Sequence, residues 1–309
     1  MIILSVQSNG EWNMYNGIIN IYKEKGFTSH DVVAKLRGIT KQKKIGHTGT
    51  LDPNAEGVLP VCFGNATKLC DIITDKSKEY RTVLLLGQET DTQDTSGEII
   101  NSDDSWKNLS EDEIKDAIYS FVGTYDQIPP MYSAIKINGK KLYELARKGE
   151  VVERKPRKVT IDRIEINKIN LPYVEMTIGC SKGTYIRTLC HDIGEKLKCN
   201  GCMDSLLRTR VGRFFVEDSI KLSKIEELVK NNEFEDILIP PDKMFDYEII
   251  HIKEEASKLV YNGNKFVLDH ISELDVVKTR YYRVYDQNNT FVGIYERKGY
   301  VFSPYKMFL

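Results

Sequence analysis

Residues 44–60 read KIGHTGTLDPNAEGVLP, and the centre of this stretch is rich in residues that form turns. Two glycines, two threonines, a histidine and an aspartate fall within residues 46–52, and Pro53 follows Asp52 directly. Glycine and proline interrupt helices and central strands, so the stretch predicts a constrained loop. Pro53 also biases Asp52 away from helical backbone angles. An aspartate in such a turn often only bonds a nearby backbone N–H, so the local pattern alone leaves a structural and a catalytic role open.

The segments around this loop predict a mixture of helices and strands. Residues 28–41 open with the capping residues Thr28 and Ser29 and continue with apolar residues at helical spacing. Other segments show β-branched and aromatic runs that end at glycine or at a polar turn. The patterns predict helices over 28–41 and 110–123, a buried strand over 79–90, a strand–turn–helix unit over 173–197 and a hairpin over 281–296.

Charge and proline content divide the chain. From Met131 to Lys158 there are nine Lys or Arg residues against three Glu, with Tyr132 and Tyr143 among them. A basic stretch with aromatic residues suits contact with RNA, although a solvated basic face has the same composition. An acidic connector over 231–247 contains Pro240 and Pro241, which places a domain boundary there. We therefore expect an α+β architecture: a large mixed domain followed by a small β-rich module.

Composition excludes several classes of protein. The chain has 309 residues and a net charge of -1, which is not that of a globally basic nucleic-acid binder. Neither a membrane-spanning run nor a signal peptide is recognised, so the cytosol is the expected compartment. Six cysteines without a secretion signal are expected to be reduced thiols. Cys199 and Cys202 form a lone CxxC, whereas a structural zinc site usually has two such pairs, so no metal is expected.

The loop also resembles a motif of phosphoryl-transfer enzymes. Thr48-Gly-Thr-Leu51 is similar to the phosphorylation motif of P-type ATPases, but that motif has an aspartate two residues before its first threonine. Gly46 stands at that position here, and the chain contains no GxxxxGK[ST] phosphate-binding loop. Phosphoryl transfer is therefore excluded.

The longer sequence around the loop resembles that of the TruB-type tRNA pseudouridine synthases. The resemblance runs in order from about Asn16 to Phe214, about two-thirds of the chain. It is carried by GHTGTLDPNAEGVLPVCFGNATKL (46–69), KEYR (78–81), LGQETDTQDTSGE (87–98), IPPMYSAIKINGKKLYELARKG (128–149) and CSKGTYIRTLCHDIGEKL (180–197). Five blocks in register are far more specific than one short motif.

This resemblance implies a fold and a division of the chain. The fold would be a pseudouridine synthase catalytic domain built on a mixed, mainly antiparallel sheet with flanking helices. The catalytic domain would span residues 14–244 and carry a basic thumb-like insertion at about 127–158. Residues 245–309 would form a PUA-like RNA-binding module, a likeness that rests on YYRVYDQNNTFVGIYE (281–296). Residues 1–13 would be an N-terminal extension.

The resemblance also implies a reaction. The family isomerises uridine to pseudouridine in the T-loop of tRNA, at position 55, acting on a uridine that has been flipped out of the stack. No atoms are gained or lost, so no cofactor and no metal are expected. Asp52 matches the catalytic aspartate, acting either as a nucleophile at the sugar or as a base. The expected partner is the tRNA T-stem-loop, bound by a monomer away from any membrane.

Six further residues match positions of the family's site. Arg187, in GTYIR, matches an arginine that pairs with the catalytic carboxylate, which a planar guanidinium can hold by two hydrogen bonds. Tyr80 matches the active-site tyrosine, which would stack on the base and help to remove the C5 proton. The remaining matches are Tyr185 and Leu206, which line the uridine pocket, His47, which contacts the flipped nucleotides, and Lys23, a basic position near the site.

The chain departs from the family pattern at two of these segments. Glu24 replaces a proline in KEKGFTS, which puts the local loop shape and the role of Lys23 in question. Leu207 stands where arginine is common. A non-catalytic RNA-binding protein remains the rival reading. A hydrolytic glycosidase is disfavoured because it needs a second carboxylic acid.

Overall fold

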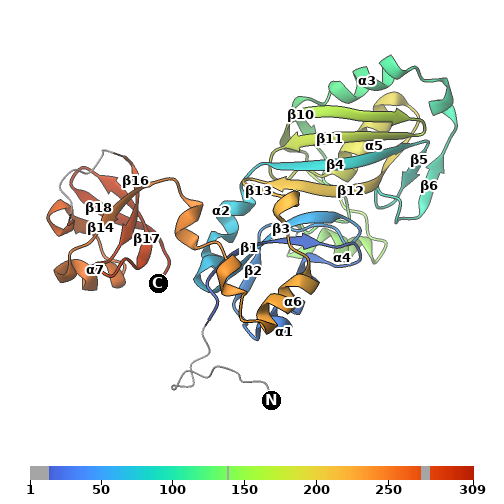
Figure 1. Ribbon diagram of the computed structural model, residues 1–309. Coiled ribbons are helices and arrows are strands. Elements are labelled where there is room, and N and C mark those ends of the chain that lie inside the picture. Colours follow the sequence, from blue (N-terminus) through green and yellow to red (C-terminus); the bar gives the residue numbers. More distant parts are fainter. Residues whose placement is uncertain (1–13, 138, 273–278) are drawn as a thin grey trace.

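A computed structural model describes residues 14–137, 139–272 and 279–309 of the chain (Figure 1). The expected extension at 1–13 lies outside the described residues. The main feature is a nine-stranded sheet with the path β1-β3-β12-β4-β11-β10-β7, in which β2 pairs with β3 and β13 with β12. Its strands are β1 Gly17–Lys23, β2 Ile45–His47, β3 Glu56–Phe63, β4 Lys78–Leu86, β7 Gly123–Gln127, β10 Arg157–Asn170, β11 Tyr173–Cys180, β12 Gly201–Val211 and β13 Phe214–Phe215.

The sheet is mixed and mainly antiparallel, as expected. The parallel pair is β3 and β12, where Leu207 faces Glu56 and Arg208 faces Gly57. Gly57 adopts a φ of +104°, and a Cβ at this position would lie 2.3 Å from the Arg208 carbonyl oxygen. Only glycine therefore allows these two strands to approach so closely.

Helices form at the three places where the sequence predicts them, within 28–41, 110–123 and 173–197, and at further places where it does not. They are α1 Ser29–Thr40, α2 Cys70–Thr74, α3 Glu111–Tyr119, α4 Leu142–Ala146, α5 Ile186–Leu197, α6 Leu222–Lys230 and α7 Ser257–Tyr261. Short 3-10 turns lie at Gly64–Leu69, Ser105–Asn108, Val216–Asp218, Glu235–Ile237, Pro241–Met244, Glu254–Ala256 and Leu268–His270. The side chain of Thr28 caps α1 and that of Ser110 caps α3, each within a capping box.

The strand–turn–helix unit forms as predicted, whereas the predicted C-terminal end of the helix over 110–123 was wrong. Strand β11 ends at Cys180, and α5 packs Ile186, Leu189 and Ile193 into the core beside β4 and β11 (Figure 1). Helix α3 ends at Tyr119 and not at residue 123. Gly123 instead opens β7 with a φ of +109°, because a strand has to start there after a sharp change of direction.

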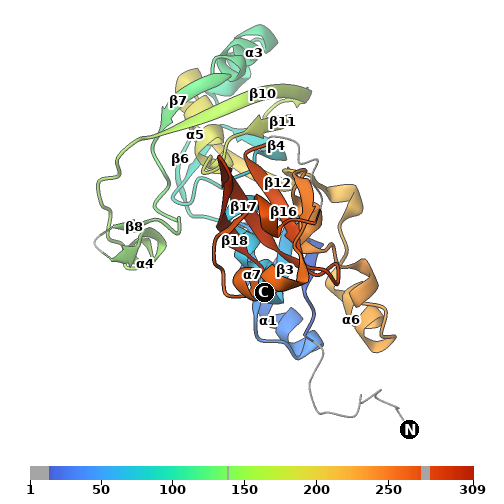
Figure 2. The ribbon, with the colours of Figure 1, turned by 90° about the vertical axis from the view of Figure 1, so that its left-hand side faces the viewer.

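The basic segment 127–158 packs around a small core of its own. Strands β8 Lys136–Ile137 and β9 Lys140–Lys141 pair with each other next to α4. Met131, Leu142 and Leu145 form the centre of this core. Figure 2 shows β8 and α4 standing away from the body of the sheet. A second hairpin, β5 Gln88–Thr90 with β6 Ile99–Ser102, extends from the end of β4.

The C-terminal part forms a separate five-stranded sheet. Its order is β14-β16-β17-β18-β15. The strands are β14 Glu248–His251, β15 Phe266–Val267, β16 Tyr281–Tyr285, β17 Phe291–Lys298 and β18 Val301–Met307, and β16 with β17 is the predicted hairpin. This sheet shares an apolar cluster with the larger one, since Ile294 and Phe308 pack with Ile18 and Val58. Among the described residues, no helix has the length and apolar character needed to cross a membrane.

Candidate active site

Asp52 lies in a short loop between β2 and β3, and neighbouring segments fix the backbone of this loop. The Leu51 N–H donates to Ser29 Oγ at 2.9 Å, so the first residue of α1 holds the loop just before Asp52. The Gly26 N–H donates to the Pro53 carbonyl at 2.9 Å on the other side of Asp52. The carboxylate is therefore presented from a backbone that is held at both flanks.

Lys23 lies buried beneath the loop. Its ammonium donates to the carbonyl oxygens of Ala55 at 2.6 Å and Pro53 at 3.2 Å. Burial lowers the pKa of Lys23 to about 8, although the charges of Asp52 and Glu56 act in the opposite direction. The structure thus places this predicted residue at the site, where its contacts are with backbone carbonyls of the loop.

Arg187 binds the carboxylate of Asp52 at two points. Its Nε lies 2.9 Å from Asp52 Oδ2, and its Nη2 donates to Asp52 Oδ1 at 3.3 Å. The Arg187 side chain is 5% exposed and that of Asp52 is 37% exposed. The guanidinium thus fixes one side of the Asp52 carboxylate. The carboxylate is still partly exposed to solvent, so a substrate could reach it.

The same guanidinium also binds two segments of backbone. Arg187 Nη1 donates to the Thr92 carbonyl and Nη2 to the Tyr132 carbonyl, both at 2.8 Å. Tyr132 belongs to the basic segment 127–158, so that segment is tied to the arginine that orients Asp52. A second carboxylate approaches the nitrogen that contacts Asp52, since Asp94 Oδ2 lies 3.8 Å from Arg187 Nε.

Two tyrosines lie near the carboxylate of Asp52, and a leucine packs with one of them. Tyr80, on β4, is buried, and burial raises its pKa to about 12. Burial also raises the pKa of Tyr185, whose N–H donates to Gln127 Oε1 at 2.8 Å just before α5. The charge of Asp52 contributes to both of these pKa shifts, since it disfavours phenolates nearby. Leu206, on β12, belongs to the same apolar cluster as Tyr80.

His47 lies at the start of the loop, on β2. Its ring meets that of His30 edge to face, with centroids 5.2 Å apart. Burial lowers the pKa of His47, and the charges of His30 and Arg208 act in the same direction. These effects favour a neutral imidazole, which suits hydrogen bonding or stacking with a nucleotide.

Another buried cation, in addition to Lys23 and Arg187, was missed by the sequence analysis. Arg208, on β12, is 1% exposed, and its guanidinium donates to backbone carbonyls on the loop and on β3. The sequence LLRTRVGRF reads as a basic strand with no sign that this one arginine points inward. The parallel register of β3 and β12 brings it under the loop, and this register depends on tertiary structure.

Potential metal ligands do not gather in the part of the chain that the structure describes: no group of three or more His, Cys, Asp or Glu side chains is placed to hold an ion. All six cysteines are free thiols, and Cys199 and Cys202 are both buried.

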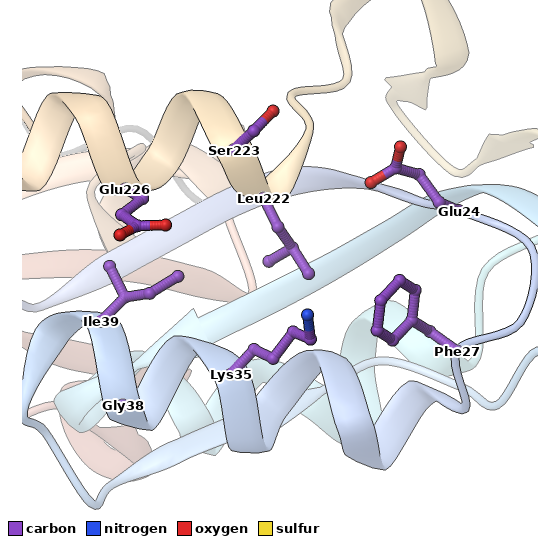
Figure 3. Close-up of a pocket in the computed structure, with 8 residues that line it drawn as sticks. All are labelled: Glu24, Phe27, Lys35, Gly38, Ile39, Leu222, Ser223 and Glu226. Atoms are coloured by element: carbon purple, nitrogen blue, oxygen red, sulfur yellow. The ribbon is translucent and has the colours of Figure 1, made fainter.

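A pocket of about 500 Å³ lies elsewhere, between α1 and α6 (Figure 3). Lys35 Nζ stands 4.4 Å from the centre of the Phe27 ring in this pocket. Glu24 and Glu226 lie at its rim, while Leu222 and Ile39 provide apolar surface (Figure 3). None of the predicted site residues lines this pocket, so it is separate from the candidate site around Asp52.

Comparison with known proteins identifies the class to which this fold and site belong. Residues 37–186 match the sequence profile of the TruB family pseudouridylate synthase N-terminal domain. Residues 187–246 match that of the tRNA pseudouridylate synthase B C-terminal domain. The solved structure of a Cbf5-Nop10-Gar1 complex contains a chain with a TM-score of 0.69 and 25% identity, over 99% of this chain and 92% of that one. The class is that of the pseudouridine synthases, which are isomerases.

Curated relatives identify the family. A tRNA pseudouridine synthase B from Lachnoclostridium phytofermentans is 54% identical over 308 residues, covering 95% of this chain and 100% of the relative. Another, from Clostridium tetani, is 47% identical over 297 residues, covering 94% of this chain and 99% of the relative. The chain belongs to the TruB family of pseudouridine synthases.

Proposed function

We propose that this enzyme isomerises a uridine in the T-loop of tRNA, at position 55, to pseudouridine, with Asp52 as the catalytic carboxylate and without a cofactor. The observation that carries the proposal is the two-point contact between Arg187 and a carboxylate that is still partly exposed. The relatives named tRNA pseudouridine synthase B support tRNA as the substrate.

The reaction breaks the N1–C1′ bond, turns the uracil over and joins C5 to C1′. A carboxylate can assist either by attacking the sugar or by removing a proton from it. Both routes need a carboxylate oxygen that faces the sugar while the rest of the group is held still. Arg187 provides this orientation from inside the protein, and the backbone bonds to Leu51 and Pro53 hold the loop.

The side chains that line the site would retain the detached uracil until the new bond forms. We propose that Tyr80 stacks on the base and takes up the C5 proton, while Tyr185 and Leu206 line the pocket. The burial of Tyr80 and Leu206 and the partial burial of Tyr185 support these roles, since such a lining excludes water that would otherwise divert the sugar to hydrolysis. His47 would contact the flipped nucleotides from the loop's edge, and Lys23 would hold the loop from below.

RNA would be held by surfaces outside this pocket. The uridine has to leave the stacked loop before it can react, which requires contacts to the RNA backbone and to flanking bases. Segment 127–158, with its surplus of positive charge and its tie to Arg187, is the proposed thumb that closes on the RNA. We further propose residues 14–244 as the catalytic domain and 245–309 as an RNA-binding module, acting as a monomer in the cytoplasm.

The test is conversion of an unmodified tRNA transcript under single-turnover conditions. Pseudouridine is mapped chemically along the whole RNA, and a transcript with cytidine in place of the target uridine serves as the control. We expect product at the T-loop uridine alone. Tight binding of the RNA without product would refute the proposal in favour of a non-catalytic RNA-binding role. Product at a different uridine would refute the T-loop assignment.

A further inference from the structure

Arg208 is a buried cation beneath the active site. Its side chain is among the largest that are fully buried, at 1% exposure. Among residues 14–137, 139–272 and 279–309, no carboxylate lies within 4.0 Å of its guanidinium, whereas Arg187 has Asp52. Burial of a charge without an ion pair is costly, so a protein seldom retains one unless it serves another purpose.

The guanidinium binds the Asp52 loop and its exit strand. Nε donates to the Val58 carbonyl at 2.7 Å, Nη1 to Thr50 at 3.3 Å and Nη2 to Gly49 at 3.4 Å. Its backbone position is fixed in turn by the close approach of Gly57. Arg208 therefore holds the residues just before Asp52 and those at the start of β3.

The guanidinium has one further neighbour, the phenol of Tyr80. Arg208 on β12 and Tyr80 on β4 are register partners in the antiparallel pair, so the two side chains are neighbours across the sheet. The charge of Arg208 lowers the pKa of Tyr80 against the larger, raising effect of burial. The hydrogen bonds of Arg187 go to Asp52 and to the carbonyls of Thr92 and Tyr132, so they are not directed at the phenol. One side chain thus connects the loop of the carboxylate with the phenol on β4.

We propose that Arg208 is a positioning residue that fixes the Asp52 loop relative to the Tyr80 hydroxyl and supplies the buried positive charge that balances negative charge on the Tyr80 oxygen during the reaction. This inference rests on the proposed function. An arginine suits the role because it stays charged at every working pH. A phenolate beside a guanidinium gains a charge-assisted hydrogen bond that is stronger than a neutral one.

The proton transfer in which this charge acts is balanced within the site and solvent. The Tyr80 phenol first gives its hydroxyl proton to water. Once C5 is joined to C1′, the C5–H bond breaks, its electron pair forms the C5–C6 double bond, and the pair of the N1–C6 double bond returns to N1. The C5 proton passes to the Tyr80 phenolate oxygen, which restores the phenol, and N1 takes a proton from water. Without a neighbouring cation, the phenolate would be a lone buried anion beside the carboxylate of Asp52.

Two substitutions separate the geometric and the electrostatic parts of this role. Arg208→Lys keeps the charge but loses the planar fork, whereas Arg208→Gln keeps a planar donor but loses the charge. Arg210→Lys is the matched control, because Arg210 lies two residues further along β12 and its Nη1 bonds the Gly212 carbonyl at 3.3 Å. Single-turnover rates from pH 6.5 to 9.5, tRNA affinity and thermal midpoints are measured for each, after wild-type conversion has been shown.

We expect Arg208→Lys to lower the rate about 100-fold, as for other preorganised donors, with tRNA affinity within about threefold of wild type. Arg208→Gln should lose more and displace the pH–rate curve to higher pH, because the pKa of Tyr80 rises without the adjacent charge. Arg210→Lys should match wild type.

The proposal is overturned by a rate within threefold of wild type in both Arg208 variants, by losses of rate that parallel losses of tRNA affinity, or by an unshifted pH–rate curve in Arg208→Gln. If neither variant folds, Arg208 serves core stability and the proposal fails. Absence of wild-type conversion would instead overturn the proposed function.

Discussion

Substitution of Arg187 by lysine tests whether the orientation of Asp52 depends on a planar guanidinium. The arginine makes four polar contacts: an ion-pair contact with Asp52 Oδ2, and hydrogen bonds to Asp52 Oδ1, the Thr92 carbonyl and the Tyr132 carbonyl. A lysine ammonium has three N–H groups in a tetrahedral arrangement, and it cannot reach all four acceptors.

The expected magnitude follows from this count. A hydrogen bond to a charged group contributes about 1.5–3 kcal/mol, so loss of the two-point contact removes about 3 kcal/mol of transition-state stabilisation. At about 1.4 kcal/mol for each factor of ten, the single-turnover rate should fall about 100-fold. A buried carbonyl left without a donor should also lower the free energy of unfolding by about 1–3 kcal/mol.

The assay combines single-turnover conversion of tRNA with urea unfolding. Arg163→Lys is the control, because Arg163 forms an exposed ion pair with Glu79 at the surface of the sheet. It should change the rate and the stability little, since exposed pairs contribute about 0–1 kcal/mol. A rate for Arg187→Lys within threefold of wild type, with normal tRNA affinity, would show that the planar guanidinium is not needed to orient the Asp52 carboxylate.

Further predictions concern the loop and its supports. Asp52→Asn should bind tRNA normally and give no measurable single-turnover product; a tenth of the wild-type rate would exclude Asp52 as the catalytic group. The pKa of Lys23 falls from its ordinary 10.5 to about 8 in the folded protein. The folded state therefore binds fewer protons than the unfolded state between these values, and the free energy of unfolding should gain up to about 3 kcal/mol from this group as pH rises from 8 to 10.5. Urea titrations of Lys23→Met should show a smaller rise, because Lys78, whose pKa burial also lowers to about 8, is still present; an identical rise in both proteins would contradict the assignment. Gly57→Ala should destabilise the fold by at least about 2 kcal/mol, because a Cβ would meet the Arg208 carbonyl at 2.3 Å; unchanged urea unfolding would contradict this. Conversion of tRNA should survive EDTA once magnesium for RNA folding is supplied separately, and loss that zinc restores would implicate Cys199 and Cys202.

The elements of the fold could be predicted where local chemistry determines them. Thr28 and Ser110 mark helix starts because their side chains cap exposed N–H groups, and both capping boxes form. The hairpin at 281–296 follows from its polar turn. The end of α3 was misplaced because Gly123 suits a helix stop and a strand start equally well, and the pairing of β7 with β10 decides between them.

Candidate site residues could be named from the sequence, but the contacts between them could not. Resemblance to a family indicated Asp52 and Arg187, and the structure brings these two together. Neither Arg208 nor the bond from Ser29 to the loop could be foreseen. A buried arginine in a strand has the same local pattern as an exposed one, and its direction is fixed only by the register between β3 and β12. The link from Arg187 to Tyr132 likewise joins segments that are 55 residues apart.

The residues that hold the Asp52 loop are synthesised at different times, which sets the order in which the site can form. During synthesis, Lys23, Ser29 and the loop itself leave the ribosome early, and β1, α1 and β3 can associate as soon as they emerge. Arg187 and Arg208 follow more than a hundred residues later, and β12 has to enter the sheet between β3 and β4. Until then the carboxylate of Asp52 lacks its guanidinium partner, and the loop lacks its bonds to Arg208. If Asp52 acts as proposed, a nascent chain would not convert uridine until residue 208 has been made and placed.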